Sequence, residues 1–158
     1  MRQLNSKHGG ITMVELAVVL AIIGLLANAA LPPLAAYVTN SRLREAANGV
    51  LSQALWTRSE AIKRNTTTKL QLTDGNFQIS TTEAGAVQVL RKASMPSSVQ
   101  AKDFSASFDS SGRITPFGTQ MKVVLSTPNQ TCSEDIRCPA VLVDSGGSVS
   151  ICPTGVCP

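Results

Sequence analysis

Cysteine is the residue type whose number and spacing most directly imply chemistry in this 158-residue chain. The four cysteines all fall within the last 27 residues, at Cys132, Cys138, Cys152 and Cys157. Structural zinc sites usually take cysteines in pairs with two to four residues between them, and only the last two cysteines have such a spacing. An even count favours disulfide bonds formed in an oxidising compartment. We therefore expect two structural disulfides, and neither a metal ion nor another cofactor.

A single carboxylate, that of Glu15, stands at the head of an apolar segment, where its charge needs a partner. It is the only ionised side chain between Ile11 and Ser41. Burial of an unpaired carboxylate in hydrocarbon costs a few kcal/mol. A cut between Gly10 and Ile11 would create a cation, because the new α-amino group lies four residues away on the same helix face. In an assembly, Glu15 could instead pair with the amine of a neighbouring subunit.

The residues from Leu16 to Ala36 form an apolar run in which Asn28 has the only hydrogen-bonding side chain. About 20 such residues are enough to cross a bilayer as a helix. Residues 1–10 carry two basic side chains and no acid, which predicts a cytoplasmic amino end and a body outside, in a bacterial periplasm. The alternative is a secretory signal peptide cut near Ala27–Ala29, which would leave Glu15 without a role.

Downstream of this run, apolar residues recur at a spacing of three and four from Leu43 to Ile62, which predicts an amphipathic helix. We expect it to continue the apolar helix, so that one helix runs from Thr12 to Arg64. Pro32 and Pro33 lack a backbone donor, and we expect them to interrupt and bend this helix.

Short runs of alternating polar and apolar residues follow the helix, separated by turn residues, and they predict about seven strands. These runs cover residues 66–73, 77–82, 86–90, 104–108, 121–126, 140–143 and 148–152. A long helix on an antiparallel sheet makes an α+β domain. Its core would come from the apolar stripe of the helix and the inward strand positions, with Trp56 and Tyr37 as large core residues or interface anchors.

The amino-terminal segment KHGGITMVELAVVLAIIGLLANAALP resembles the class III signal of type IV pilin-like proteins. The matching features are Lys7, Gly10, Thr12, Glu15 as the fifth residue after the cut, and an apolar helix reaching Pro32. The resemblance implies cleavage after Gly10 by a prepilin peptidase, methylation of the new amino terminus and polymerisation through the helix. It makes Glu15 and Pro32 assembly residues. The chain departs from the family pattern at Ile11, where phenylalanine is usual.

Two later segments, LWTRSEAIKRN (Leu55–Asn65) and FDSSGRITPFG (Phe108–Gly118), resemble the GspH/FimT group of minor pilins and pseudopilins. This resemblance implies the type IV pilin fold, with residues 1–10 as a removed leader, 11–36 as a transmembrane and assembly helix, and 37–158 as a periplasmic globular domain. It also implies as partners other pilin subunits, the prepilin peptidase, an inner-membrane assembly platform and membrane lipid. We therefore predict a structural subunit of a type IV pilus or a type II secretion pseudopilus.

The charged helix segment and the cysteines permit more detailed expectations. Ala61 and Ile62 are expected to face the core, and the charged residues Arg58, Glu60, Lys63 and Arg64 to be solvated or weakly paired. If residues 144–147 close a hairpin with Val143 opposite Ser148, one bulge would align Cys138 with Cys152 and leave Cys132 for Cys157. The sequential pairing, Cys132 with Cys138 and Cys152 with Cys157, needs only short loops and stays open.

DNA binding for uptake is the alternative function. In DNA-uptake members of the group, a Gly-Arg-x-Arg element on the last hairpin contacts phosphates, but this chain has Gly147-Ser148-Val149-Ser150 there, and serine releases no counterions. The candidates for a substitute basic patch are Arg91, Lys92, Lys102, Arg113, Lys122 and Arg137. The net charge of +4 is too small to indicate a nucleic-acid surface by itself.

An enzyme is not expected. The single histidine, His8, precedes the expected cut, and the remaining chain has no phosphate-binding glycine loop and no convincing pair of nucleophile and base.

Overall fold

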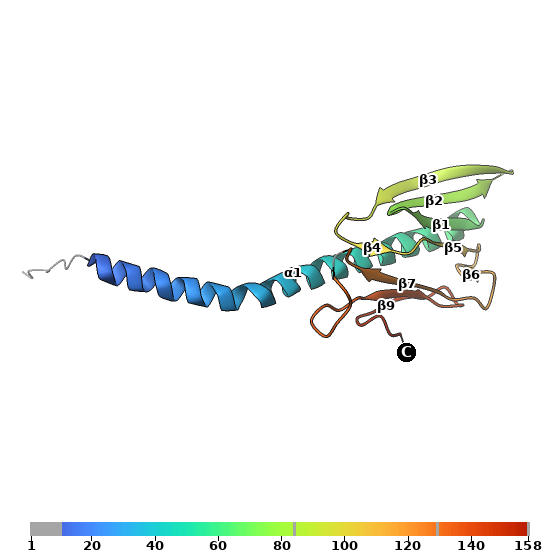
Figure 1. The fold of residues 1–158 in the computed structure, drawn as a ribbon. Coiled ribbons are helices and arrows are strands. Elements are labelled where there is room, and N and C mark those ends of the chain that lie inside the picture. The colour runs from blue at the N-terminus through green and yellow to red at the C-terminus, as the bar shows by residue number, and fades with distance from the viewer. Residues whose placement is uncertain (1–10, 84, 129, 158) are drawn as a thin grey trace, which may run out of the picture. The chain divides into compact units, whose positions relative to one another are not determined.

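The computed structural model describes residues 11–83, 85–128 and 130–157, without the side chains of 28–32 (Figure 1). The predicted leader, including Gly10 and the proposed cut after it, lies outside the described residues. The chain divides into two compact units, Met1–Tyr37 and Val38–Pro158, which are described separately.

The long helix α1 (Met13–Arg64) has the predicted extent to within one residue. Thr12 caps its first turn, because the Thr12 hydroxyl accepts the backbone N–H of Glu15 at 3.2 Å. At the other end Asn65 adopts a positive φ of 52°, and the N–H of Thr66 donates to the carbonyl of Ala61 at 3.2 Å, which closes the last turn. These end contacts explain why the helix begins and ends where it does.

Pro32 and Pro33 lie inside α1, whose helical assignment is continuous through both residues. The expectation that they interrupt the helix is therefore wrong. Each proline removes one backbone donor, and the hydrogen bonds on either side of the pair are enough to continue the helix. The expected bend at this point stays a prediction.

Within the part of the chain that the structure describes, nine strands follow the helix and form two antiparallel sheets in the second unit (Figure 1). The strands are β1 (Thr68–Thr73), β2 (Asn76–Glu83), β3 (Ala86–Ser94), β4 (Gln100–Ala101), β5 (Phe104–Phe108), β6 (Ile114–Thr115), β7 (Met121–Ser126), β8 (Ala140–Val143) and β9 (Val149–Cys152). The larger sheet has the order β3-β2-β1-β5-β6 and the smaller one β4-β7-β8-β9. The seven predicted strands are confirmed, and the two-residue strands β4 and β6 are additional.

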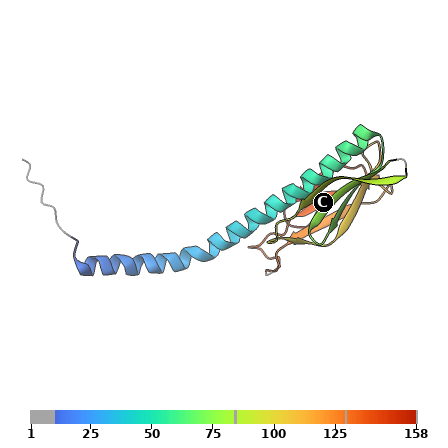
Figure 2. The same cartoon turned by 90° about the horizontal axis from the view of Figure 1, so that it is seen from above.

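One hydrophobic core joins both sheets to the part of α1 that belongs to this unit, and Figure 2 shows that part running beside the strands. The helix contributes Leu43, Ala46, Ala47, Val50, Ala54 and Ala61. The strands contribute Leu70, Leu72, Phe77, Ile79, Ala106, Phe108, Ile114, Met121, Val123, Leu125, Val141 and Val143. Spacings of three and four along the helix and of two along the strands place these residues on the inner faces.

The expectations for four individual side chains have mixed outcomes. Trp56 is half-buried against the core, whereas Tyr37 is 71% exposed and is not a core residue. Ala61 is fully buried as predicted, but Ile62 is 49% exposed, so the expectation that it faces the core is wrong. Ile62 instead lies over the loop between β5 and β6, since a Cβ built on Gly112 would be 2.8 Å from Ile62 Cδ1.

The two disulfides join Cys132 to Cys138 and Cys152 to Cys157. The sequential pairing is therefore correct and the nested pairing is wrong. The hairpin register explains the error, because Ala140 and not Pro139 lies opposite Cys152, which places Cys138 two residues from that position. With all four cysteines bonded to one another, no thiolate remains to bind zinc.

Candidate assembly site

The first unit is an apolar helix whose large side chains are exposed along its described length. The exposed residues are Met13, Val14, Leu16, Val18, Val19, Leu20, Ile22, Ile23, Leu25, Leu26 and Leu34, each between 47% and 89% exposed. Because neighbouring positions such as Val18, Val19 and Leu20 point to different sides of a helix, no side is polar enough to face water alone. A helix that is hydrophobic all round needs burial against lipid or other helices.

Among the residues that the structure describes, no helix is both long and apolar enough to qualify as a membrane span. The membrane helix expected over Leu16–Ala36 therefore stays a prediction.

Glu15 lies in the first turn of α1, where the positive end of the helix dipole favours a carboxylate. Its own N–H donates to Thr12 Oγ1, and threonine three residues before glutamate is the sequence of a capping box. The helix terminus therefore gives Glu15 a structural role that the sequence argument did not consider. Ile11, the expected new terminus, is 76% exposed beside this turn.

The two segments that resemble the GspH/FimT group meet in the second unit. Arg58 Nε donates to the carbonyl oxygen of Gly112 at 2.9 Å, which ties α1 to the loop between β5 and β6. The turn between β8 and β9 reaches the same carbonyl, because a Cβ built on Gly147 would overlap the Gly112 oxygen. Helix, loop and last hairpin therefore converge on the backbone of Gly112, and we call Arg58, Gly112 and Gly147 the glycine junction.

The loop that carries the junction is held by one carboxylate. Asp109 Oδ1 accepts hydrogen bonds from Ser111 N, Ser111 Oγ and Arg113 N, at 2.9, 2.6 and 3.0 Å. These bonds, led by the one from the Ser111 hydroxyl, hold the pKa of Asp109 below its usual value. The loop is thereby pre-shaped to present the Gly112 carbonyl to Arg58.

Glu60 is buried, with 10% of its side chain exposed, so the expectation that the charged residues of this segment are solvated is wrong for it. Arg64 Nε donates to Glu60 Oε2 at 2.9 Å and Arg64 Nη1 donates to Glu83 Oε1 at 3.1 Å. Lys63 lies 3.7 Å from the other Glu60 oxygen. The hydrogen bond from Arg64 is the main reason that the pKa of Glu60 is lowered. The network links the end of α1 to β2, a connection that needs Glu83 and was invisible in the helix sequence.

Asn40 attaches the first disulfide loop to α1. Its Nδ2 donates to the carbonyl of Asp135 at 2.7 Å, and its Oδ1 accepts the N–H of Arg137 at 2.9 Å. Ile136, between these two partners, is buried in the core. The loop closed by Cys132–Cys138 is therefore fixed to the helix by two hydrogen bonds and to the core by the residue between them.

The six basic residues predicted as a substitute DNA patch lie on two different sheets and in three loops. Arg91 and Lys92 are on β3, Lys122 is on β7, and Lys102, Arg113 and Arg137 are in loops. Two of them have local partners: Arg91 lies 5.5 Å from the ring centroid of Trp56, and Arg113 lies 5.5 Å from that of Phe117. Arg113 Nε is also 3.8 Å from Asp109 Oδ2.

Comparison with solved structures places this fold among pilin-like proteins. Two crystal structures of the type IV minor pilin FimU of Pseudomonas aeruginosa superpose with TM-scores of 0.59 and 0.62 at 19% identity. They cover 73% and 77% of this chain and 96% of FimU in each case. The minor pseudopilin EpsH from the type 2 secretion system of Vibrio cholerae superposes with a TM-score of 0.59 at 13% identity, over 73% of this chain and 99% of EpsH. These matches show the type IV pilin-like fold, with a helix packed on a sheet body.

A search of curated proteins found no match. The model of the family described as type II transport protein GspH matches residues 46–155, which contain the glycine junction, the Glu60 network and the first disulfide. The match covers more than half of the chain, which therefore belongs to the GspH family of minor pilins and pseudopilins.

Proposed function

We propose that this protein is a structural subunit of a type IV pilus or a type II secretion pseudopilus, incorporated through the first unit of α1. The supporting observation is the set of large apolar side chains exposed along that helix. Removing one such side chain from water contributes roughly 1.5–3 kcal/mol, so this helix has to be covered either by lipid or by neighbouring helices at every stage. Before assembly, the same surface would be held in the bacterial inner membrane with the second unit in the periplasm.

In this proposal, a prepilin peptidase removes residues 1–10, and the new Ile11 amine, methylated or not, lies close to Glu15. Glu15 then serves two purposes that can be separated. Its charge pairs with an amine of its own or a neighbouring subunit, and its position in the Thr12 turn stabilises the start of the helix. Pro32 would contribute to the packing of the helix among its neighbours.

The test is incorporation of Glu15 variants into sheared filaments. Glu15→Val should still be cut to a chain that begins at Ile11 and should stay in the membrane, but it should be lost from filaments. Glu15→Gln separates the two purposes, since glutamine can also complete a capping box but carries no charge. The matched control is Glu45→Val, which removes an exposed glutamate from the same helix within the second unit. Wild-type incorporation of Glu15→Val would contradict the proposal.

DNA binding for uptake is a second proposal, and one contact favours it. Gly147, which opens the segment matching the DNA-contact element, packs against the Gly112–Arg113 backbone, so the backbone of one of the six candidate basic residues lies beside that hairpin. The full chain in detergent should then shift duplex DNA at low salt, and Arg113→Glu should weaken the shift. No shift at low salt would dismiss this function.

A further inference from the structure

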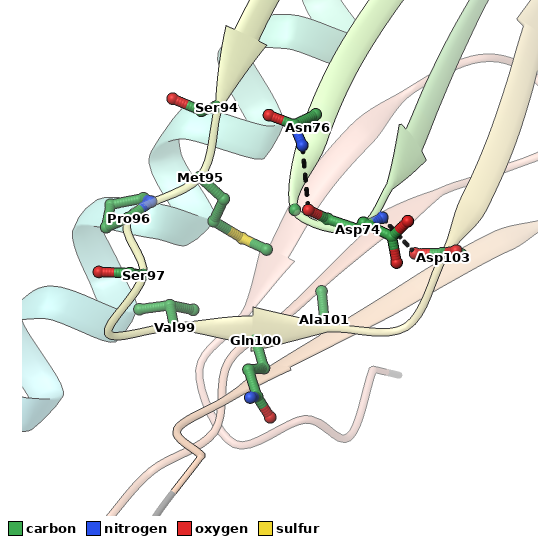
Figure 3. Close-up of a pocket in the computed structure, with 11 residues that line it drawn as sticks. Asp74, Asn76, Ser94, Met95, Pro96, Ser97, Val99, Gln100, Ala101 and Asp103 are labelled. Carbon is green, nitrogen blue, oxygen red and sulfur yellow. Dashed lines mark hydrogen bonds between the residues drawn. The ribbon is translucent and has the colours of Figure 1, made fainter.

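A cavity of about 540 Å³ opens in the second unit where the turn between β1 and β2 meets the segment that joins β3 to β4 (Figure 3). Its walls are tied together by hydrogen bonds that two backbone amides donate. Met95 N donates to the carbonyl of Gly75 at 2.8 Å, and Asp74 N donates to Asp103 Oδ1 at 3.1 Å. The cavity is therefore bounded by segments that hold one another in place, rather than by free loops.

One side of the cavity is apolar. Val99 is 4% exposed, and Met95 and Ala101 pack against the core as partly buried residues. Figure 3 shows the Met95 side chain pointing between the β1–β2 turn and β4, with the Ala101 methyl group directed toward it. This side suits the aliphatic part of a ligand.

The other side is polar and carries the negative charge of two exposed carboxylates. Asp74 and Asp103 lie next to each other there, as Figure 3 shows. The Asp103 carboxylate is oriented by the Asp74 amide, which leaves its Oδ2 atom available. The side-chain Nδ2 of Asn76 donates to the carbonyl of Asp74 at 3.1 Å, so the Oδ1 atom of the same amide is also available. A ligand group that is complementary to this side of the cavity is a positively charged hydrogen-bond donor.

No cation of the described chain satisfies these two carboxylates. Neither Asp74 nor Asp103 forms an ion pair with a described lysine or arginine. None of the eleven lining residues is basic, and Lys102, although adjacent to Asp103 in sequence, does not line the cavity. Apolar contact for a methylene chain beside acceptors for a charged head is the combination that a lysine or arginine side chain requires.

We propose that this cavity is a docking site for a lysine or arginine side chain on a neighbouring filament subunit. The inference rests on the proposed function, since it needs a filament to supply the neighbour. The aliphatic stem lies against Met95, Val99 and Ala101, and the charged head binds Asp74 and Asp103. The site thereby provides a contact between globular bodies in addition to the packing of the apolar helices.

The test is site-specific photo-cross-linking in intact filaments from cells that make the full chain. A benzophenone amino acid replaces Ser97, an exposed residue on the rim, and a second variant carries it at Ser110, an exposed residue in the β5–β6 loop. Mass spectrometry of the cross-linked peptides then identifies the neighbour. The expected Ser97 product is a peptide of another filament subunit that contains a lysine or arginine.

A charge-neutral double variant, Asp74→Asn with Asp103→Asn, gives the decisive comparison. This variant preserves the fold for two reasons. Asparagine tolerates the positive φ of 49° at position 74. At position 103, the side-chain oxygen of asparagine can still accept the hydrogen bond from the backbone N–H of residue 74. Loss of two ion pairs should lower the Ser97 cross-link about fivefold or more and leave the Ser110 product unchanged.

A Ser97 cross-link that is unchanged in the double variant, or that maps to a peptide without a basic residue, overturns the proposal. The absence of any Ser97 product from filaments that contain the protein overturns it equally. The amount of wild-type protein in the sheared filaments is measured by immunoblot in the same samples. Its absence there refutes the proposed function itself, so the two failures are distinguishable.

Discussion

The glycine junction gives a prediction whose size can be worked from the structure. Gly147 has a φ of +79°, and a Cβ at this position would overlap the carbonyl oxygen of Gly112. In Gly147→Ala, the left-handed backbone costs about 1–2 kcal/mol. Separating two backbones in contact costs about 1–3 kcal/mol more. The free energy of unfolding should therefore fall by about 2–5 kcal/mol, which at roughly 4 °C per kcal/mol lowers the melting temperature by about 8–20 °C.

Two matched glycines divide this total into its parts. Gly118 has a φ of +83° with nothing within 4 Å of an added Cβ, so Gly118→Ala should show the backbone cost alone, about 1–2 kcal/mol. Gly146 lacks the positive φ, and its nearest neighbour is the Asp144 side-chain oxygen at 3.3 Å, so Gly146→Ala should change stability by less than about 1 kcal/mol.

The assay is thermal unfolding of the full chain in detergent, followed by fluorescence. Trp56 is the only tryptophan and is half-buried against the core, so its emission reports loss of the second unit. If the free energy of unfolding of Gly147→Ala is no lower than that of Gly118→Ala, the close approach of the hairpin to Gly112 adds no energetic cost to the substitution. The reasoning about the junction would then be refuted.

Three further predictions concern the contacts around α1. Glu60→Gln should destabilise the protein at pH 7. Because folding lowers the pKa of Glu60, the difference in free energy of unfolding between wild type and variant should be present above about pH 5 and shrink as the pH falls below about 4. Unfolding in urea at several pH values measures this difference. Equal pH dependence of both proteins would show that this ion pair does not contribute. Replacing either disulfide pair by serines should cost about 2 kcal/mol each, because both loops are short, and peptide mapping without reduction should recover the two pairs separately. Asn40→Ala should lower the free energy of unfolding by about 1–3 kcal/mol and speed proteolysis between Cys132 and Cys138. Asn40→Asp keeps only the acceptor for the Arg137 amide, so its cleavage rate should lie between those of the wild type and Asn40→Ala. Equal cleavage in all three proteins would contradict the role of Asn40.

Local patterns in the sequence predicted most of the fold, because helices and strands longer than about four residues carry a readable periodicity. Strands β4 and β6 have two residues each, too few for alternation to be visible. The register of the last hairpin was wrong by one residue because Asp144 pairs with Ser148, which leaves a three-residue loop where a four-residue loop was expected. That single shift also decided between the two disulfide pairings.

The site was less predictable, because its key contacts join residues far apart in sequence. Arg58 donates to a carbonyl 54 residues away, and nothing in the helix sequence indicates a backbone acceptor. Glu60 is buried, and its partner Arg64 also reaches Glu83 on β2, a residue outside the helix sequence. The cap that Thr12 places on the first turn could have been predicted, because a threonine three residues before a glutamate is the sequence of a capping box.

The short span of both disulfides affects how the chain matures. The sequence separation is 6 for the first pair and 5 for the second, and the pairs do not overlap in sequence. A chain that emerges amino end first into an oxidising compartment presents Cys132 and Cys138 together before either later cysteine appears. An oxidant that simply joins each cysteine to the next free one therefore produces the native bonds, so correct pairing requires no subsequent isomerase.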